Sequence, residues 1–383
     1  MNCGNKKAGL PCENPAFVSQ EGLEPSTHAL KGHCSTTELL ARETQCSTSF
    51  LFCKFPPMLF FLRSTILALF LTFFSAHAGD FSNWSTNSGQ GLFSFLELFQ
   101  GPRNTALSGT GSSAFTPDIL ATLVNPGNVL ASPTQHTVAI SWEAGALSQQ
   151  EGLLAWRFNL GKTTLQTTYA WISNDPIRGL DESGAETGIS YQPFDQSINL
   201  TAAYPFPDFT FGATAKWIRD HLSDDAGDYN AIGLAMDWGL VWKSPSPRYG
   251  FALSVLDLGK QFTPYTANGV DNLALNTRIK LSTHYRPVAI RGLTVYLDTD
   301  FPRYSQAIGR LGLEYNPSAW FQLRAGTARS LSSLVKNPAS ADLASVATGG
   351  LGVTWAGFTF DYSINILRDG FGQLHRLGLR TGF

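Results

Sequence analysis

The sequence predicts an all-β fold: a transmembrane antiparallel β-barrel of about fourteen strands, with sixteen as the alternative count, and a small N-terminal plug containing a short helix. Three observations lead to this prediction. Beyond residue 134 nearly every segment alternates between apolar and polar side chains, charged residues make up only 15% of the chain, and the chain stops on an alternating segment whose last residue is Phe383. Because successive side chains of a strand point to opposite faces, such segments can turn one face to lipid.

The segment before residue 79 predicts export. Met58 opens a short stretch that contains Arg63, an apolar run follows over residues 65–74, and Ala76-His77-Ala78 supplies an A-x-A motif. These parts stand in the order of a secretory signal peptide, with cleavage between Ala78 and Gly79. A transmembrane anchor is the competing interpretation, but spanning requires roughly 20 consecutive apolar residues and this run is shorter.

The position of this signal sets the expected domain organisation. Secretory signals are read at the N-terminus, so we expect residues 1–57 to be a disordered, non-native extension from a mis-assigned start. The signal peptide 58–78, a plug segment 79–134 and a barrel 135–383 follow. All five cysteines precede residue 58, and the mature chain therefore has none for a disulfide or a zinc site.

Alternation is clearest over residues 232–242, 275–285 and 358–366. In the second of these one face comprises Leu275, Thr277, Ile279, Leu281, Thr283 and Tyr285, and the other is polar. Weaker copies span residues 138–143, 154–160, 165–171, 209–217, 251–255, 293–300, 310–315, 321–326, 347–355 and 377–383, and residues 188–204 count as one strand with a break at Pro193. The total is fourteen, an even number as in single-chain bacterial barrels.

Alternation alone also fits a soluble β-sandwich, and three further features favour a membrane barrel. Aromatic residues stand near the ends of the apolar stripes, where an interfacial girdle is expected: Trp142, Trp171, Trp217, Trp242, Tyr285, Tyr315 and Trp355. The polar faces are rich in small residues, with charges of both signs. The C-terminal segment ending in Phe383 resembles the signal that the barrel assembly machinery reads. These features predict the bacterial outer membrane, with its lipid as a partner.

The plug segment contains Arg103, Gly109 and Gly111 in one motif and Asn125-Pro126-Gly127 in a second. Between them, Thr116 as N-cap and Pro117 as first helical residue predict a short helix that ends before Pro126.

The candidate functional residues are the ions on the polar faces, which would point into the lumen. They are Arg157, Lys216, Asp237, Arg278, Lys280, Asp298, Glu314, Arg324, Asp361, Arg376 and Arg380. One interpretation is structural, because polar barrel interiors are filled by paired charges. The other is that some line a path or contact a ligand.

Catalysis, cofactors, metals and nucleic acid are not predicted. Four histidines follow the signal (His136, His221, His284 and His375), and none stands in an H-E-x-x-H motif or beside a G-x-S-x-G elbow. The Gly109-Thr-Gly-Ser-Ser stretch lacks the G-K-[ST] of a phosphate-binding loop. A net charge of −2 with no basic cluster argues against a nucleic-acid partner.

The order of several short motifs resembles the PorV/PorQ-type outer-membrane proteins, which are related in fold to the FadL fatty-acid transporters. They are the two plug motifs, Phe211–Ile218, Gly233–Leu240, Leu311–Tyr315 and the terminal His375–Leu379. Leu256–Gly259 departs from the N-x-G common in the family, and Leu273-Ala274 from its Leu-Pro.

The resemblance implies a fourteen-stranded barrel that serves as an accessory component of type IX protein secretion or surface attachment. Its partners would be type IX secretion subunits or the C-terminal domains of cargo. Two alternatives stay open: a FadL-like passive transporter of small hydrophobic molecules, and a structural barrel. A transporter should have a kink or gap in its wall and an apolar pocket under the plug, lined by Phe93, Phe95, Leu98 and Phe99.

Overall fold

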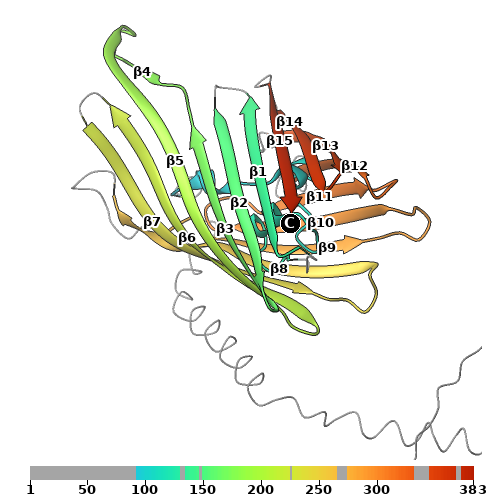
Figure 1. The fold of residues 1–383 in the computed structure, drawn as a ribbon. Coiled ribbons are helices and arrows are strands. Elements are labelled where there is room, and N and C mark those ends of the chain that lie inside the picture. The colour runs from blue at the N-terminus through green and yellow to red at the C-terminus, as the bar shows by residue number, and fades with distance from the viewer. Residues whose placement is uncertain are drawn as a thin grey trace, which may run out of the picture. The chain divides into compact units, whose positions relative to one another are not determined.

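The computed structural model describes residues 92–129, 134–145, 149–224, 227–264, 274–331, 345–367 and 372–383. The predicted extension, signal peptide and cleavage point fall outside these residues. Fourteen antiparallel strands form a closed barrel, and the described part of the plug lies inside the ring of strands (Figure 1).

The barrel strands follow one another around the wall. They are β1 (His136–Gly145), β2 (Gln150–Leu160), β3 (Thr163–Ser173), β5 (Glu186–Pro205), β6 (Phe209–Asp224), β7 (Gly227–Trp242), β8 (Tyr249–Thr263), β9 (Arg278–Tyr285), β10 (Leu293–Pro302), β11 (Ile308–Tyr315), β12 (Phe321–Ser330), β13 (Ser345–Trp355), β14 (Phe358–Leu367) and β15 (Gln373–Gly382). Pairing of β1 with β15 and of β3 with β5 closes the ring. Each predicted strand has its counterpart here, and the fourteen-stranded barrel is confirmed.

One strand was not predicted. The short β4 (Ile177–Leu180) pairs only with the first part of β5, beyond the residues of β5 that pair with β3. It therefore extends a hairpin above the wall and does not enter the ring.

The two ends of the barrel have different connections. At the end where β1 begins and β15 stops, two to seven residues join successive strands. One of the two-residue connections is Ala356-Gly357, in which both residues have positive φ (50° and 84°), as a type I′ hairpin turn requires. At the other end the connections 264–277 and 331–344 are much longer. We call these the short-turn end and the long-loop end.

The outer wall is apolar along every clear stripe. Leu234, Leu281 and Phe360 are about half exposed, whereas their neighbours in the chain point inward. An aromatic belt lies near the short-turn end, made of the exposed residues Trp242, Tyr249, Tyr285, Tyr315, Trp320 and Trp355. Such a belt is typical of the interface between hydrocarbon and headgroups. Among the described residues, no helix is both long enough and apolar enough to span a bilayer.

Two details of the strand prediction are wrong. The predicted break at Pro193 is absent, because β5 runs through this residue, which pairs with Leu222 of β6. Leu275 and Thr277 do not face outward with Leu281, because β9 begins only at Arg278. Leu275 is fully buried and forms an isolated parallel bridge with Leu92 of the plug, which draws this stretch into the lumen.

The predicted helix exists but begins later. It is the 3-10 helix η3 (Ile119–Leu123), and its N-cap is Asp118, whose Oδ1 accepts a hydrogen bond of 3.0 Å from the Leu120 amide. Thr116 instead orders the cap, because its hydroxyl accepts a 3.2 Å bond from the Asp118 amide. Two further short helices were not predicted, η2 (Ser94–Glu97) and α3 (Pro102–Ala106).

The outward position of Leu281 supports a stability prediction. We expect Leu281→Arg to destabilise the barrel by about 2–4 kcal/mol, because the charge would enter lipid midway along the wall. Leu160→Arg, on the same face at the short-turn end of β2, should cost no more than about 1 kcal/mol. Urea unfolding in lipid vesicles measures both, and equal costs would contradict the assignment of this face to lipid.

Candidate functional site

The first plug motif is a one-turn helix with a left-handed exit. Proline at the start of α3 fits the first helical position, which needs no amide donor. The chain leaves the helix through Ser108, Gly109 and Gly111, whose φ angles are 57°, 80° and 97°, and the Gly109 amide donates to the Asn104 carbonyl at 2.7 Å. Glycine adopts this backbone at little cost, which explains both glycines of the motif.

This exit turn lies directly on the barrel wall. Gly312 of β11 and Gly326 of β12 are register partners. A Cβ at Gly312 would lie 2.1 Å from the Thr110 hydroxyl, and one at Gly326 would lie 2.5 Å from the Leu107 carbonyl carbon. Glycine inside a strand often marks such a close approach of another backbone. The pair is therefore a seat for the first motif.

The second motif, Asn125-Pro126-Gly127, has a matching seat. Gly212 of β6 and Gly239 of β7 are also register partners. A Cβ at Gly212 would lie 2.1 Å from the Pro126 carbonyl oxygen, and one at Gly239 would lie 2.0 Å from Asn125 Oδ1. The same Oδ1 accepts a 2.8 Å bond from the Gly127 amide and shapes the turn. Two glycine pairs thus hold the two plug motifs.

Cations on the wall bind the first motif. Lys280 Nζ and Arg310 Nη1 donate to the carbonyl oxygens of the Ser108–Gly109 turn at 2.6 and 2.9 Å. Asp300 pairs with both, at 3.3 Å from Lys280 and 2.6 Å from Arg310, and Asp298 lies 3.7 Å from Lys280. The two carboxylates hold Lys280 and Arg310 in position, and these cations bind the plug.

A second ion cluster ties α3 to the wall. Arg103 Nε lies 2.9 Å from Glu314, which also accepts from Arg324 Nε at 3.1 Å. Arg324 reaches on to Asp361, and Arg103 Nη2 donates to the Tyr296 hydroxyl at 3.1 Å. All five side chains are buried. The arginine of the first motif is therefore paired, as buried charge requires.

A third cluster lies under an irregular part of β8. Lys216 Nζ lies 2.8 Å from Asp237 and 2.6 Å from Asp257, and Arg278 lies 2.9 Å from Asp257. The Asp257 amide donates to Asp237 Oδ1 at 2.7 Å. Asp257 itself has a φ of 58° and stands where the register of β7 with β8 shifts. Asp257 therefore stands in a β-bulge, which bends a strand locally.

The remaining predicted ions divide into two cases. Arg376 is paired with Glu143 and Glu151, each at 2.8 Å, near the long-loop end. Arg157 is 2% exposed, and its Nε and Nη1 find no hydrogen-bond partner among the described residues. Arg380 is partly buried, and its one hydrogen bond among the described residues goes to the Thr359 hydroxyl, at 3.1 Å. Neither Arg157 nor Arg380 forms an ion pair with a carboxylate in the part of the chain that the structure describes.

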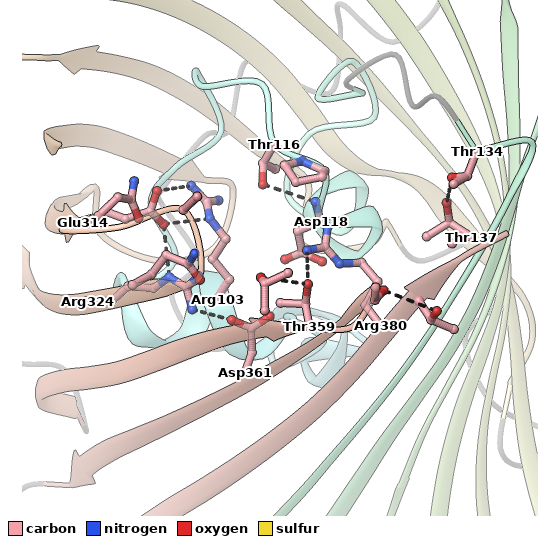
Figure 2. Close-up of a pocket in the computed structure, with 18 of the residues that line it drawn as sticks. Arg103, Thr116, Asp118, Thr134, Thr137, Glu314, Arg324, Thr359, Asp361 and Arg380 are labelled. Atoms are coloured by element: carbon pink, nitrogen blue, oxygen red, sulfur yellow. Dashed lines mark hydrogen bonds and ion pairs between the residues drawn. The ribbon is translucent and has the colours of Figure 1, made fainter.

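A cavity of about 640 Å³ opens at the short-turn end, between the plug and the wall. Its charged lining residues are Arg103, Asp118, Arg157, Glu314, Arg324, Asp361 and Arg380, and most of the others are threonines or carry amides and hydroxyls. Figure 2 shows Arg103, Glu314 and Arg324 on one side and Thr134 and Thr137 on the other, with Asp118 and Arg380 between them.

The aromatic part of the plug is packed against the barrel wall. Phe93, Phe95 and Phe99 are buried in one cluster with apolar wall residues, among them Ile172. Their rings meet edge to face, with centroids 6.0 and 5.7 Å apart. Leu98, the fourth residue of the expected pocket, is 47% exposed.

Sequence reasoning missed several residues of these clusters. Asp257, Asp300, Arg310, Glu143 and Glu151 complete the ion pairs, and the glycines of the two seats hold the plug. Asp257 interrupts an otherwise alternating strand, which was a usable signal for a bulge. The seat glycines stand inside predicted strands, where glycine needs an explanation.

Phe383 closes the wall beside β1. Its amide and carbonyl exchange 3.0 Å hydrogen bonds with His136, whose ring lies 5.6 Å from its own. Its role as assembly signal stays a prediction. Within the described residues no group of three or more histidine, cysteine or acidic side chains is placed to hold a metal ion.

Comparison with known proteins shows which solved structures share this fold. No family model matches the chain, and no curated protein matches it. Solved structures do. The toluene transporters TbuX of Ralstonia pickettii and TodX of P. putida are each 13% identical, with a TM-score of 0.54 over 74% of this chain and 98% of theirs. The CymD monoaromatic hydrocarbon channel is 10% identical, also with a TM-score of 0.54, over 75% and 98%.

At these identities the likeness concerns the fold. The closed barrel is of the bacterial outer-membrane type, and it shares its fold with these two transporters and this channel. The predicted outer-membrane barrel fold is thereby confirmed, whereas membership of the PorV/PorQ-type proteins stays a prediction.

Proposed function

We propose that the protein is an outer-membrane channel for small hydrophobic molecules and that the plug is its gate. The observation that carries the proposal is the plug itself, which is held inside a fourteen-stranded barrel with an apolar aromatic cluster toward the long-loop end. The structural neighbours support it, since they are transporters or channels for toluene and monoaromatic hydrocarbons.

The orientation follows from the connections. Bacterial barrels have short turns in the periplasm and longer loops outside the cell, so the aromatic cluster would meet a solute arriving from outside. Apolar surface favours transfer of a hydrophobic molecule out of water. The packed cluster and the seated plug describe a closed channel, and passage requires the plug or the bulged wall at Asp257 to shift.

The test is uptake of a monoaromatic hydrocarbon by bacterial cells that carry the protein in their outer membrane, compared with cells that lack it. A polar sugar of similar size serves as the control solute. We expect faster uptake of the hydrocarbon alone. Equal hydrocarbon uptake by the two strains would contradict the proposal.

A second candidate, an accessory barrel for type IX secretion or surface attachment, is favoured by one observation. The plug aromatics are packed against apolar wall residues, and none of them lines the cavity at the short-turn end. A pull-down from detergent-solubilised outer membranes, with a tag in the connection at residues 332–333, separates the two. Recovery of secretion subunits or cargo C-terminal domains would support the accessory role, and a barrel recovered alone would favour the channel.

A further inference from the structure

The cavity at the short-turn end is lined by more positively charged than negatively charged side chains. Four arginines and three acidic residues line it. Glu314 is bonded to Arg103 and Arg324, and Asp361 is bonded to Arg324. Asp118 is then the only acid in the cavity lining that could serve Arg157 and Arg380. One positive charge is left over.

In the structure, Asp118 is not hydrogen-bonded to either of these two arginines. Its Oδ1 is engaged as the cap of η3, and its Oδ2 has no hydrogen-bond partner among the described residues. Arg157, although 98% buried, likewise keeps two donors without a described partner. A buried guanidinium without a counter-charge is costly.

The register of the strands fixes how the two arginines face the cavity. Arg157 of β2 stands opposite Thr137 of β1, and Arg380 of β15 stands opposite Ala139 of the same strand. They therefore flank β1, one strand to each side and about 10 Å apart across the sheet. Hydroxyl groups of Thr137 and Thr359 lie in the same cavity lining.

We propose that this cavity binds a small organic oxyanion, a carboxylate or a phosphate ester, through Arg157 and Arg380. Guanidinium groups bind both kinds of anion in a bidentate manner through charge-assisted hydrogen bonds. The volume of about 640 Å³ lies in the range of small-molecule sites, and the threonine and amide lining suits a hydrophilic ligand. The site faces the periplasm, and it can bind whether or not the barrel conducts hydrocarbons.

The test is isothermal titration of the detergent-solubilised full chain with succinate and with inorganic phosphate, at constant ionic strength set by sodium chloride. We expect saturable binding of at least one, and the better of the two identifies carboxylate or phosphate chemistry. Arg157→Gln should weaken that binding by about tenfold or more, because it removes charge-assisted hydrogen bonds. Arg178→Gln, on exposed β4, is the matched control and should bind as the wild type does.

Asp118→Asn separates a ligand site from an internal ion pair. If the cavity takes an anion, removing the nearby carboxylate should tighten binding several-fold, and Arg157→Gln should leave the melting temperature of the ligand-free protein unchanged or higher. If Arg157 instead serves to pair with Asp118, both variants should lower that melting temperature. That result, or no saturable binding of either anion, would overturn the proposal.

Discussion

Gly212→Ala is expected to unseat the plug. The added methyl would lie 2.1 Å from the Pro126 carbonyl oxygen, a backbone atom of the second motif. Forcing a group into a packed site typically costs 1–3 kcal/mol, and here the plug can escape the clash by leaving its seat while the wall stays intact. We therefore expect a folded barrel with higher conductance in planar bilayers.

The matched control is Gly349→Ala in β13, where an added Cβ would have only ordinary contacts at 3.7 and 3.8 Å. It should keep the wild-type conductance and the wild-type resistance of the plug to trypsin. If Gly212→Ala matched the control in both measurements, the glycine seat would not be what holds the second motif.

Lys216→Met is expected to cause the largest loss of stability. Lys216 pairs with Asp237 and Asp257, and all three side chains are at most 6% exposed. Asp257 would keep Arg278, but Asp237 would be left as a buried charge without a cation. Breaking a buried ion pair in this way costs about 3–5 kcal/mol. Urea unfolding in lipid vesicles measures the change.

The double variant Lys216→Met with Asp237→Asn is the control for this effect. The asparagine removes the unpaired charge, and its carbonyl oxygen can still accept the bond from the Asp257 amide. We expect it to recover most of the lost free energy of unfolding. If it were as unstable as the single variant, the cost would come from lost packing of the lysine chain.

Much of the barrel was predictable because its wall is a local pattern. Successive side chains of each strand point alternately to lipid and to the lumen. The face of a residue such as Leu234 or Asp237 can therefore be predicted from the residues next to it in the chain. The pattern fails where the plug competes with the wall. Leu275 is apolar and in register with the lipid face, yet Leu92 of the plug pairs with it inside the barrel.

The plug contacts were not predictable in the same way. Arg103 and Glu314 are 211 residues apart, and nothing local in either segment specifies the other. The helix cap was misplaced by two residues because Thr116 and Asp118 both suit that position, and only the Leu120 amide decides between them. The excess positive charge around Arg157 was not predictable either, because it depends on which cation each neighbouring acid pairs with.

A reversible lock between plug and wall tests the proposed gate most directly. The Ser113 hydroxyl lies 3.2 Å from His284 Nδ1, so Ser113→Cys with His284→Cys places a thiol on the plug beside a thiol on β9. Oxidation should join them as a disulfide in protein expressed from Met58 onward, which contains no other cysteine. Hydrocarbon uptake by cells carrying this variant is measured after oxidation and again after reduction, with each single cysteine as control. A plug that gates the channel predicts slow uptake when oxidised and recovery on reduction, whereas fast uptake through a fully cross-linked barrel would contradict it.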